Sequence, residues 1–141
     1  MSQPPKPSPA AVALCGWLIP GAGYFLIGER VRAAIIAPVV LALFIMGALI
    51  GGIKVVEAPT GFTVAAILDR PWFIGQVLIG PASVAAAVVS NHIDDEQVST
   101  SRSWEIGTLY TAIAGMLNLL VVIDATHKSV VAMIEGEGKT A

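Results

Sequence analysis

The sequence predicts an all-α integral membrane protein, a bundle of four transmembrane helices. Four stretches of the chain contain no Asp, Glu, Lys or Arg, and each approaches the ~20 apolar residues that cross a hydrocarbon core of about 30 Å. Charged residues make up only 13% of the chain, against about 25% in soluble domains, and the mean hydropathy is +0.78. The uncharged stretches are residues 7–28, 33–53, 71–93 and 106–123.

The 141 residues leave room for little beyond this bundle. Residues 1–9 form a proline-rich tail that cannot hold a helix, because proline lacks an N–H donor and fixes φ. Residues 10–125 form the four-helix transmembrane domain, and residues 126–141 form a short polar tail. No separate soluble domain fits.

The first helix is expected to be broken or kinked at Pro20, Gly21 and Gly23. Proline inside a helix removes one hydrogen bond, and the neighbouring glycines add backbone freedom. Two forms stay open: a kinked helix that spans the bilayer, and a helix that stops at Ile19 and enters only half of it.

The other helices follow from the uncharged stretches. The second is expected from about Arg30 to Ile53. The apolar residues 62–68 are too short to cross and predict an interfacial turn of helix. The third runs from Pro71 to about Ser90, with proline at a helix start and Trp72 at headgroup level. After the polar loop of residues 91–105, the fourth runs from Ile106 to about Ala125.

Four spans place both termini on one side of the membrane. Cytoplasmic segments carry an excess of Lys and Arg, and the side with the termini would hold more of them, which favours cytoplasmic termini. However, Arg30 and Arg32 lie close to helix ends on the other side and oppose this orientation. The basic residues expected with the termini are Lys6, Lys54, Arg70, Lys128 and Lys139, and those expected opposite are Arg30, Arg32 and Arg102.

Small and polar residues form a regular face on the fourth helix. Gly107, Thr111 and Gly115 are spaced four apart, and Asn118 continues the same face. Gly47 and Gly51 make a similar pair on the second helix. Small residues at this spacing let helices approach closely, so these six residues predict a helix-packing or partner-binding face. The alternative is a ligand path lined by Asn118 and Thr111.

Several functions are disfavoured. Ion-coupled carriers keep ionisable groups at mid-membrane, and none of the four stretches contains Asp, Glu, Lys or Arg. No nucleophile, nucleotide-loop or paired-cysteine motif is present, so we expect no catalytic residue, no cofactor site and no enzyme activity. The net charge of −2 gives no basic face for nucleic acid.

Isolated polar residues have simple interpretations. His92 beside the acidic residues 94–96 could be a loose metal cluster, but a solvated turn fits better, and no metal site is expected. Asp124 is expected to end a span, neutralised by His127 or Lys128. Cys15 is expected to be an apolar core residue, because Leu14 before it does not fit a lipidation site. A cleaved signal peptide is a rival to a retained first helix.

Two segments resemble known families. Residues 17–30, WLIPGAGYFLIGER, resemble the hairpin of the short two-helix transmembrane domain, but Tyr24 and Phe25 replace the usual His-Arg pair. Residues 110–125, YTAIAGMLNLLVVIDA, resemble the last helix of an uncharacterised family of small membrane proteins from planctomycetes and acidobacteria. The resemblance implies a location in the bacterial inner membrane and no known activity.

The function expected from the sequence is therefore structural or interactive. The chain would be a small subunit or assembly partner of an inner-membrane complex, in contact with the lipid bilayer and with other membrane subunits or copies of itself. The alternative is a small channel or carrier whose path is lined by the fourth helix and the break at Pro20, Gly21 and Gly23.

Overall fold

The computed structural model describes residues 7–52, 55, 71–81, 83, 85–86 and 101–138, and their regular secondary structure is entirely helical. The all-α prediction is confirmed for these residues. The expected interfacial turn at residues 62–68 and most of the polar loop of residues 91–105 lie outside them. The helices are α1 (Pro9–Leu18), α2 (Ala22–Leu26), α3 (Arg30–Gly51), α5 (Pro71–Val77) and α7 (Ser101–Glu137).

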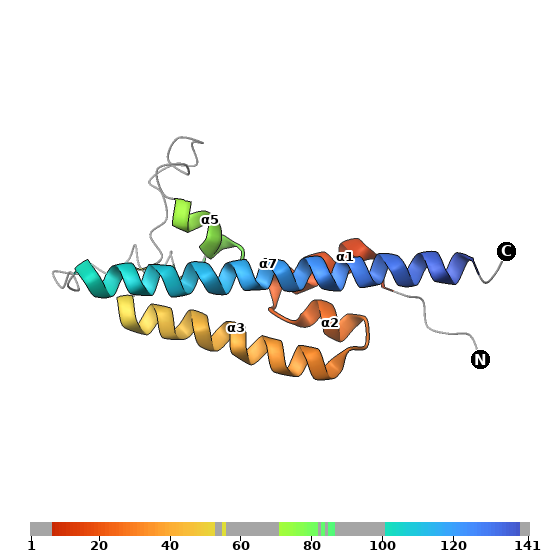
Figure 1. Ribbon diagram of the computed structural model, residues 1–141, viewed down its shortest axis with the longest axis horizontal. Coiled ribbons are helices and arrows are strands. Elements are labelled where there is room, and N and C mark those ends of the chain that lie inside the picture. The colour runs from red at the N-terminus through yellow and green to blue at the C-terminus, as the bar shows by residue number, and fades with distance from the viewer. Residues whose placement is uncertain are drawn as a thin grey trace.

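The two longest helices, α3 and α7, lie side by side and antiparallel (Figure 1). Gly51 at the end of α3 lies near Gly107 of α7, and Glu29 before α3 pairs with Lys128 near the other end of α7. Their 22 and 37 residues correspond to about 33 and 55 Å of helix. Helix α3 corresponds to the second helix expected from the sequence, from about Arg30 to Ile53, and has almost the same bounds.

The predicted break in the first helix is present. Ser8 caps α1, its side chain accepting from the backbone N–H of Ala11, and the helix ends at Leu18. Gly21 then takes a φ of 84°, a left-handed conformation that costs glycine little. The chain turns back into α2, and Gly23 lies against Val12.

This turn agrees with the form in which the first helix stops near Ile19. Ser129 Oγ donates to Pro7 O before α1, while Lys128 contacts Glu29 after α2. Both ends of the α1–α2 hairpin therefore lie at the same end of α7, and α1 reaches only half of the length of α3.

The expected continuous third helix from Pro71 to Ser90 is wrong. Helix α5 ends at Val77 after seven residues, and Gly80 takes a φ of 89° immediately before Pro81. The hydrogen bonds Ile79 N–H to Gln76 O and Gly80 N–H to Val77 O close the turn. Like α1, α5 is thus a short helix that ends inside the bundle.

The fourth helix is longer than expected. It begins at Ser101 and continues past Ala125 to Glu137, so residues 126–137 are helix rather than a tail. Among the described residues two helices are long and apolar enough to cross a membrane, Arg30–Gly51 and Arg102–Gly136, where the sequence predicts four.

Candidate functional site

The first feature of the bundle interior is the contact between α3 and α7. A Cβ added to Gly47 would lie 2.8 Å from Thr111 Cγ2, and one added to Gly107 would lie 2.6 Å from Gly47 O. A Cβ on Gly51 would lie 3.1 Å from Gly107 Cα. The four residues are therefore in close contact within one chain, where only small side chains fit.

A second close contact joins α5 to α7. A Cβ added to Gly115 would overlap with Gly75 O, and one added to Gly75 would lie 3.2 Å from Ala112 Cβ. Beside it, Gln76 Nε2 donates to Thr111 Oγ1 at 2.8 Å and to Val55 O at 2.9 Å. The predicted small-residue face of the fourth helix is thus covered by this chain's own α3 and α5.

Asn118 lies where α1 and α5 end. Its Nδ2 donates to Gly16 O at 3.4 Å and to Leu78 O at 3.0 Å, near the C-terminal ends of these two helices. The side chain is 0% exposed, and its Oδ1 has no hydrogen-bond partner among the described residues. Asn118 therefore joins both interrupted segments to α7.

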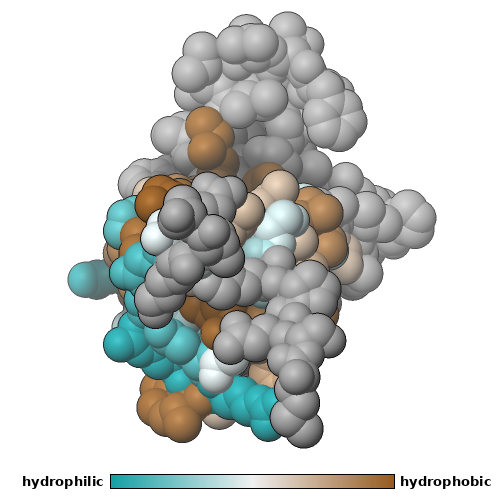
Figure 2. Space-filling model, turned by 90° about the vertical axis from the view of Figure 1, so that its right-hand side faces the viewer, coloured by the Kyte–Doolittle hydropathy of each residue, from teal (hydrophilic) through white to brown (hydrophobic). Residues whose placement is uncertain are grey.

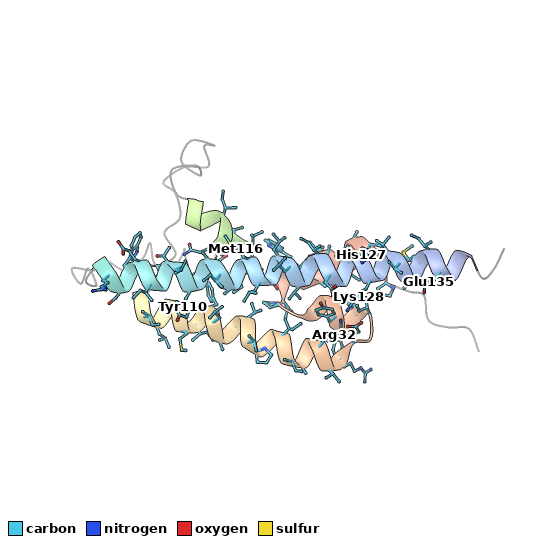
Figure 3. All side chains as sticks on the ribbon, in the orientation of Figure 1. Arg32, Tyr110, Met116, His127, Lys128 and Glu135 are labelled. Atoms are coloured by element: carbon cyan, nitrogen blue, oxygen red, sulfur yellow. The ribbon has the colours of Figure 1, made fainter. Side chains whose placement is uncertain are left out.

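Charged residues cluster at the end of the bundle where α3 begins. Lys128 Nζ lies 3.1 Å from Asp124 Oδ2 and 3.1 Å from Glu29 Oε2, and Arg32 Nε lies 3.1 Å from Glu29 Oε2. Tyr24 donates its hydroxyl hydrogen to Asp124 Oδ2. In Figure 3 Lys128 lies between α7 and the start of α3. We call these five residues the ionic cluster, and Figure 2, which faces this end, shows hydrophilic side chains gathered on one part of it.

The ionic cluster corrects the sequence-based placement of two arginines. Arg30 and Arg32 were expected opposite the termini, but Arg30 begins α3 and Arg32 shares Glu29 with Lys128. Since Pro7 contacts Ser129 on α7, this end also holds the start of the described chain. Asp124 is neutralised by Lys128, one of the two expected partners, and His127 is exposed.

The remaining candidates are the metal-binding and cysteine residues considered from the sequence. In the part of the chain that the structure describes, no three His, Cys, Asp or Glu side chains could hold a metal ion together. His92 and residues 94–96 lie outside the described residues. Cys15 is a free, half-buried cysteine in α1.

One protein family matches almost the whole of this bundle. The model of a family of unknown function, DUF6677, matches residues 11–137. The chain belongs to the DUF6677 family. The expectation of an uncharacterised family is thereby confirmed, and the matched range takes in every helix described above apart from the first residues of α1. No curated protein and no solved structure matches the chain.

Sequence reasoning missed three parts of this DUF6677 bundle: Gln76, the interruption at Gly80 and the ionic cluster. Gln76 had a signal, because it is an amide inside an otherwise apolar stretch and such groups need a partner. The pair Gly80-Pro81 was a signal for the interruption. Within the ionic cluster the sequence indicated only the pair of Asp124 and Lys128. The other members lie up to 104 positions apart, from Tyr24 to Lys128, and meet only after the α1–α2 hairpin turns back.

Proposed function

We propose that this DUF6677 protein is a multi-pass protein of the bacterial inner membrane that serves as a small subunit or assembly partner of a membrane complex. In this arrangement α3 and α7 cross the bilayer. The α1–α2 hairpin enters it to half depth from one side, and α5 enters from the other.

One observation carries the membrane proposal: charge-free segments of α3 and α7 lie next to each other and have nearly the same length. Residues 106–123 of α7 and residues 33–51 of α3 contain no charged residue, and each corresponds to about 27–29 Å of helix. The ionic cluster bounds this belt at one end, and Arg102 and Glu105 bound it at the other. The height matches a hydrocarbon core of about 30 Å.

The distribution of side chains across the belt supports the same conclusion. Large apolar residues face outward, with Leu49 78% and Leu120 62% exposed. The interior of α7 instead contains Thr111, Ala114 and Asn118. A soluble monomer rarely exposes a large contiguous apolar surface, whereas membrane bundles put small and polar residues between helices and apolar residues toward lipid.

The basic residues support cytoplasmic termini. Among the described residues, Arg30, Arg32 and Lys128 lie at the end that holds Pro7 and the last turns of α7, against Arg102 at the other end. An excess of Lys and Arg is typical of the cytoplasmic side. In a four-span arrangement Arg30 and Arg32 would lie opposite the termini and oppose this orientation. In the proposed arrangement the α1–α2 hairpin returns to the side on which it starts, so these two arginines lie on the same side as the termini.

A projecting part of α7 supports the role as an assembly partner. Beyond Lys128 the helix continues for nine residues to Glu137, and Val130, Val131 and Ile134 are exposed there. Their spacing puts these three residues, which we call the apolar stripe, on one face of the helix. Because they lie beyond the charge-free belt, another subunit is the partner that would bury them. The small-residue faces cannot serve this purpose, since α3 and α5 already cover them.

The experiment is purification of the tagged full-length protein from native membranes in mild detergent, followed by identification of the copurifying proteins. A variant with Ile134→Glu in the stripe should lose a partner that wild type retains. Glu135→Gln, on the next residue and outside the stripe, should retain it. If no protein copurifies, or if both variants retain every partner, the assembly role is wrong.

The second candidate is a small channel or carrier, and the meeting of two interrupted helices at Asn118 favours it. Discontinuous helices form the midplane sites of many carriers. It ranks second because Asn118 and Thr111 are both 0% exposed, so the structure is closed at this level. Solute flux into liposomes containing the purified protein would support the carrier and contradict a purely structural role.

A further inference from the structure

The C-terminal ends of α1 and α5 meet near the middle of the charge-free belt. Trp17 Nε1 in α1 donates to Val77 O at the end of α5, at 3.2 Å. Gly80 lies so close to Trp17 O that a Cβ on this glycine would overlap with the oxygen. Each helix C-terminus carries a partial negative charge from its unpaired carbonyl groups. Two such ends therefore face one another at this junction.

The amide of Asn118 is oriented by this junction. Both of its N–H donors are used, one toward Gly16 O and one toward Leu78 O. The opposite assignment of the amide would put Oδ1 against two carbonyl oxygens, so the hydrogen bonds fix the orientation. The oxygen that remains, Oδ1, is a fully buried acceptor without a donor among the described residues.

Two backbone acceptors at the same junction also lack a donor from the described residues. Pro20 has no N–H, and the Ile19 and Ala22 N–H groups bond to Cys15 O and Ile19 O. These bonds leave Trp17 O and Leu18 O, at the end of α1, without a backbone donor in the described part of the chain. Both oxygens lie against Gly80 at the junction, since a Cβ on this glycine would overlap with Trp17 O and lie 3.5 Å from Leu18 O. Together with the buried, unpaired Asn118 Oδ1 they point to a missing positive or donating group.

We infer that this junction binds a small monovalent cation, Na⁺ or K⁺, through Asn118 Oδ1 and the carbonyl oxygens of Trp17 and Leu18. Neutral oxygen ligands and helix C-terminal ends suit Na⁺ in discontinuous membrane helices, and carbonyl oxygens suit K⁺. Divalent Ca²⁺ and Mg²⁺ usually take carboxylate ligands, and residues 106–123 of α7 contain none. A cation here would hold α1, α5 and α7 together, whichever of the two proposed roles is correct.

The experiment is thermal unfolding of the purified full-length protein in detergent, in NaCl, KCl or choline chloride at equal ionic strength. Because a ligand that binds only the folded state stabilises it by mass action, Tm should rise by several degrees with Na⁺ or K⁺ relative to choline, and the rise should saturate. The variant Asn118→Leu should lose this dependence on the cation. Gln76→Leu, which removes another buried amide outside the junction, should keep it.

The wild-type measurement decides the question even if Asn118→Leu does not fold. Identical Tm values in all three salts would overturn the proposal and leave a buried water as the partner of Asn118 Oδ1. Stabilisation by Mg²⁺ or Ca²⁺ alone would contradict the monovalent assignment. Asn118→Asp keeps an oxygen at the junction and adds negative charge, so its Tm should depend on the cation at lower concentrations than wild type. If the Tm of Asn118→Asp does not respond to cations, the site is contradicted as well.

Discussion

Replacing Gly115 by alanine tests a very close helix contact in the bundle. A methyl group at this position would overlap with Gly75 O, so α5 has to move away from α7. In an unconstrained helix the same change would stabilise the protein by roughly 0.5–1 kcal/mol, because glycine has more backbone freedom to lose on folding. The sign of the change in stability therefore distinguishes a packed glycine from a lipid-facing one.

The magnitude follows from the contacts that depend on the position of α5. Overpacking typically costs about 1–3 kcal/mol. Displacing α5 also lengthens the Gln76–Thr111 and Asn118–Leu78 hydrogen bonds, now 2.8 and 3.0 Å, each worth about 1 kcal/mol. Subtracting about 1 kcal/mol for helix propensity leaves a net loss of roughly 2–4 kcal/mol. At about 3 °C per kcal/mol, Tm should fall by roughly 6–12 °C.

The assay is thermal unfolding of purified Gly115→Ala and Gly115→Ile in detergent, with isoleucine expected to destabilise more. Leu117→Ile is the matched control, because it conserves volume on a partly exposed face of α7 and should change Tm little. If Gly115→Ile unfolds at the temperature of Leu117→Ile, or if Gly115→Ala raises Tm, the contact between α5 and α7 is not as close as the structure indicates.

Two further predictions test the placement of charged residues. In a Cys15→Ser background, single cysteines replacing Arg30 or Gly138 should be protected from an impermeant thiol reagent in intact spheroplasts, whereas a cysteine replacing Arg102 should react. If the cysteines at positions 30 and 102 both react, the first helix crosses the membrane. Lys128→Met should lower Tm by a few degrees more than Arg102→Met. The reason is that Lys128 contacts Asp124 and Glu29, and each partly exposed ion pair contributes about 0.2–1 kcal/mol. Equal Tm values for the two variants would contradict a stabilising ionic cluster.

The part of the fold that follows from local sequence is predicted well. The bounds of α3 follow from an uncharged stretch and the charges beside it, and the break at Pro20 follows from proline followed by glycine. The spacing of the six small and polar residues predicts a packing face. It does not predict their partners, because spacing shows that a helix face permits close approach without showing which helix approaches it.

Proline alone does not predict where these helices are interrupted. Pro38 lies inside α3, which continues unbroken, whereas the chain breaks at Pro20 and before Pro81. The difference is a neighbouring glycine with positive φ at each break, Gly21 and Gly80, which lets the backbone leave the helix. The sequence-based prediction continues the third helix through Gly80 because the stretch around it stays apolar. Asp124 is expected to end a span, and it directly follows the charge-free residues 106–123, but α7 itself continues as helix to Glu137.

The two breaks and Asn118 depend on one another. Residues 18–22 read LIPGA and residues 78–82 read LIGPA, and each segment lies at the C-terminal end of a short helix, α1 or α5. Since α1 runs antiparallel to α7 and α5 runs parallel to it, the two short helices point toward each other from opposite ends of the bundle. Ending a helix inside an apolar belt releases carbonyl groups that neither lipid nor an apolar side chain can satisfy. Asn118 donates to one carbonyl near each end, so a substitution that moves either short helix leaves a buried amide donor and carbonyl without partners. This mutual dependence explains why the only amide within residues 106–123 lies at this position of α7.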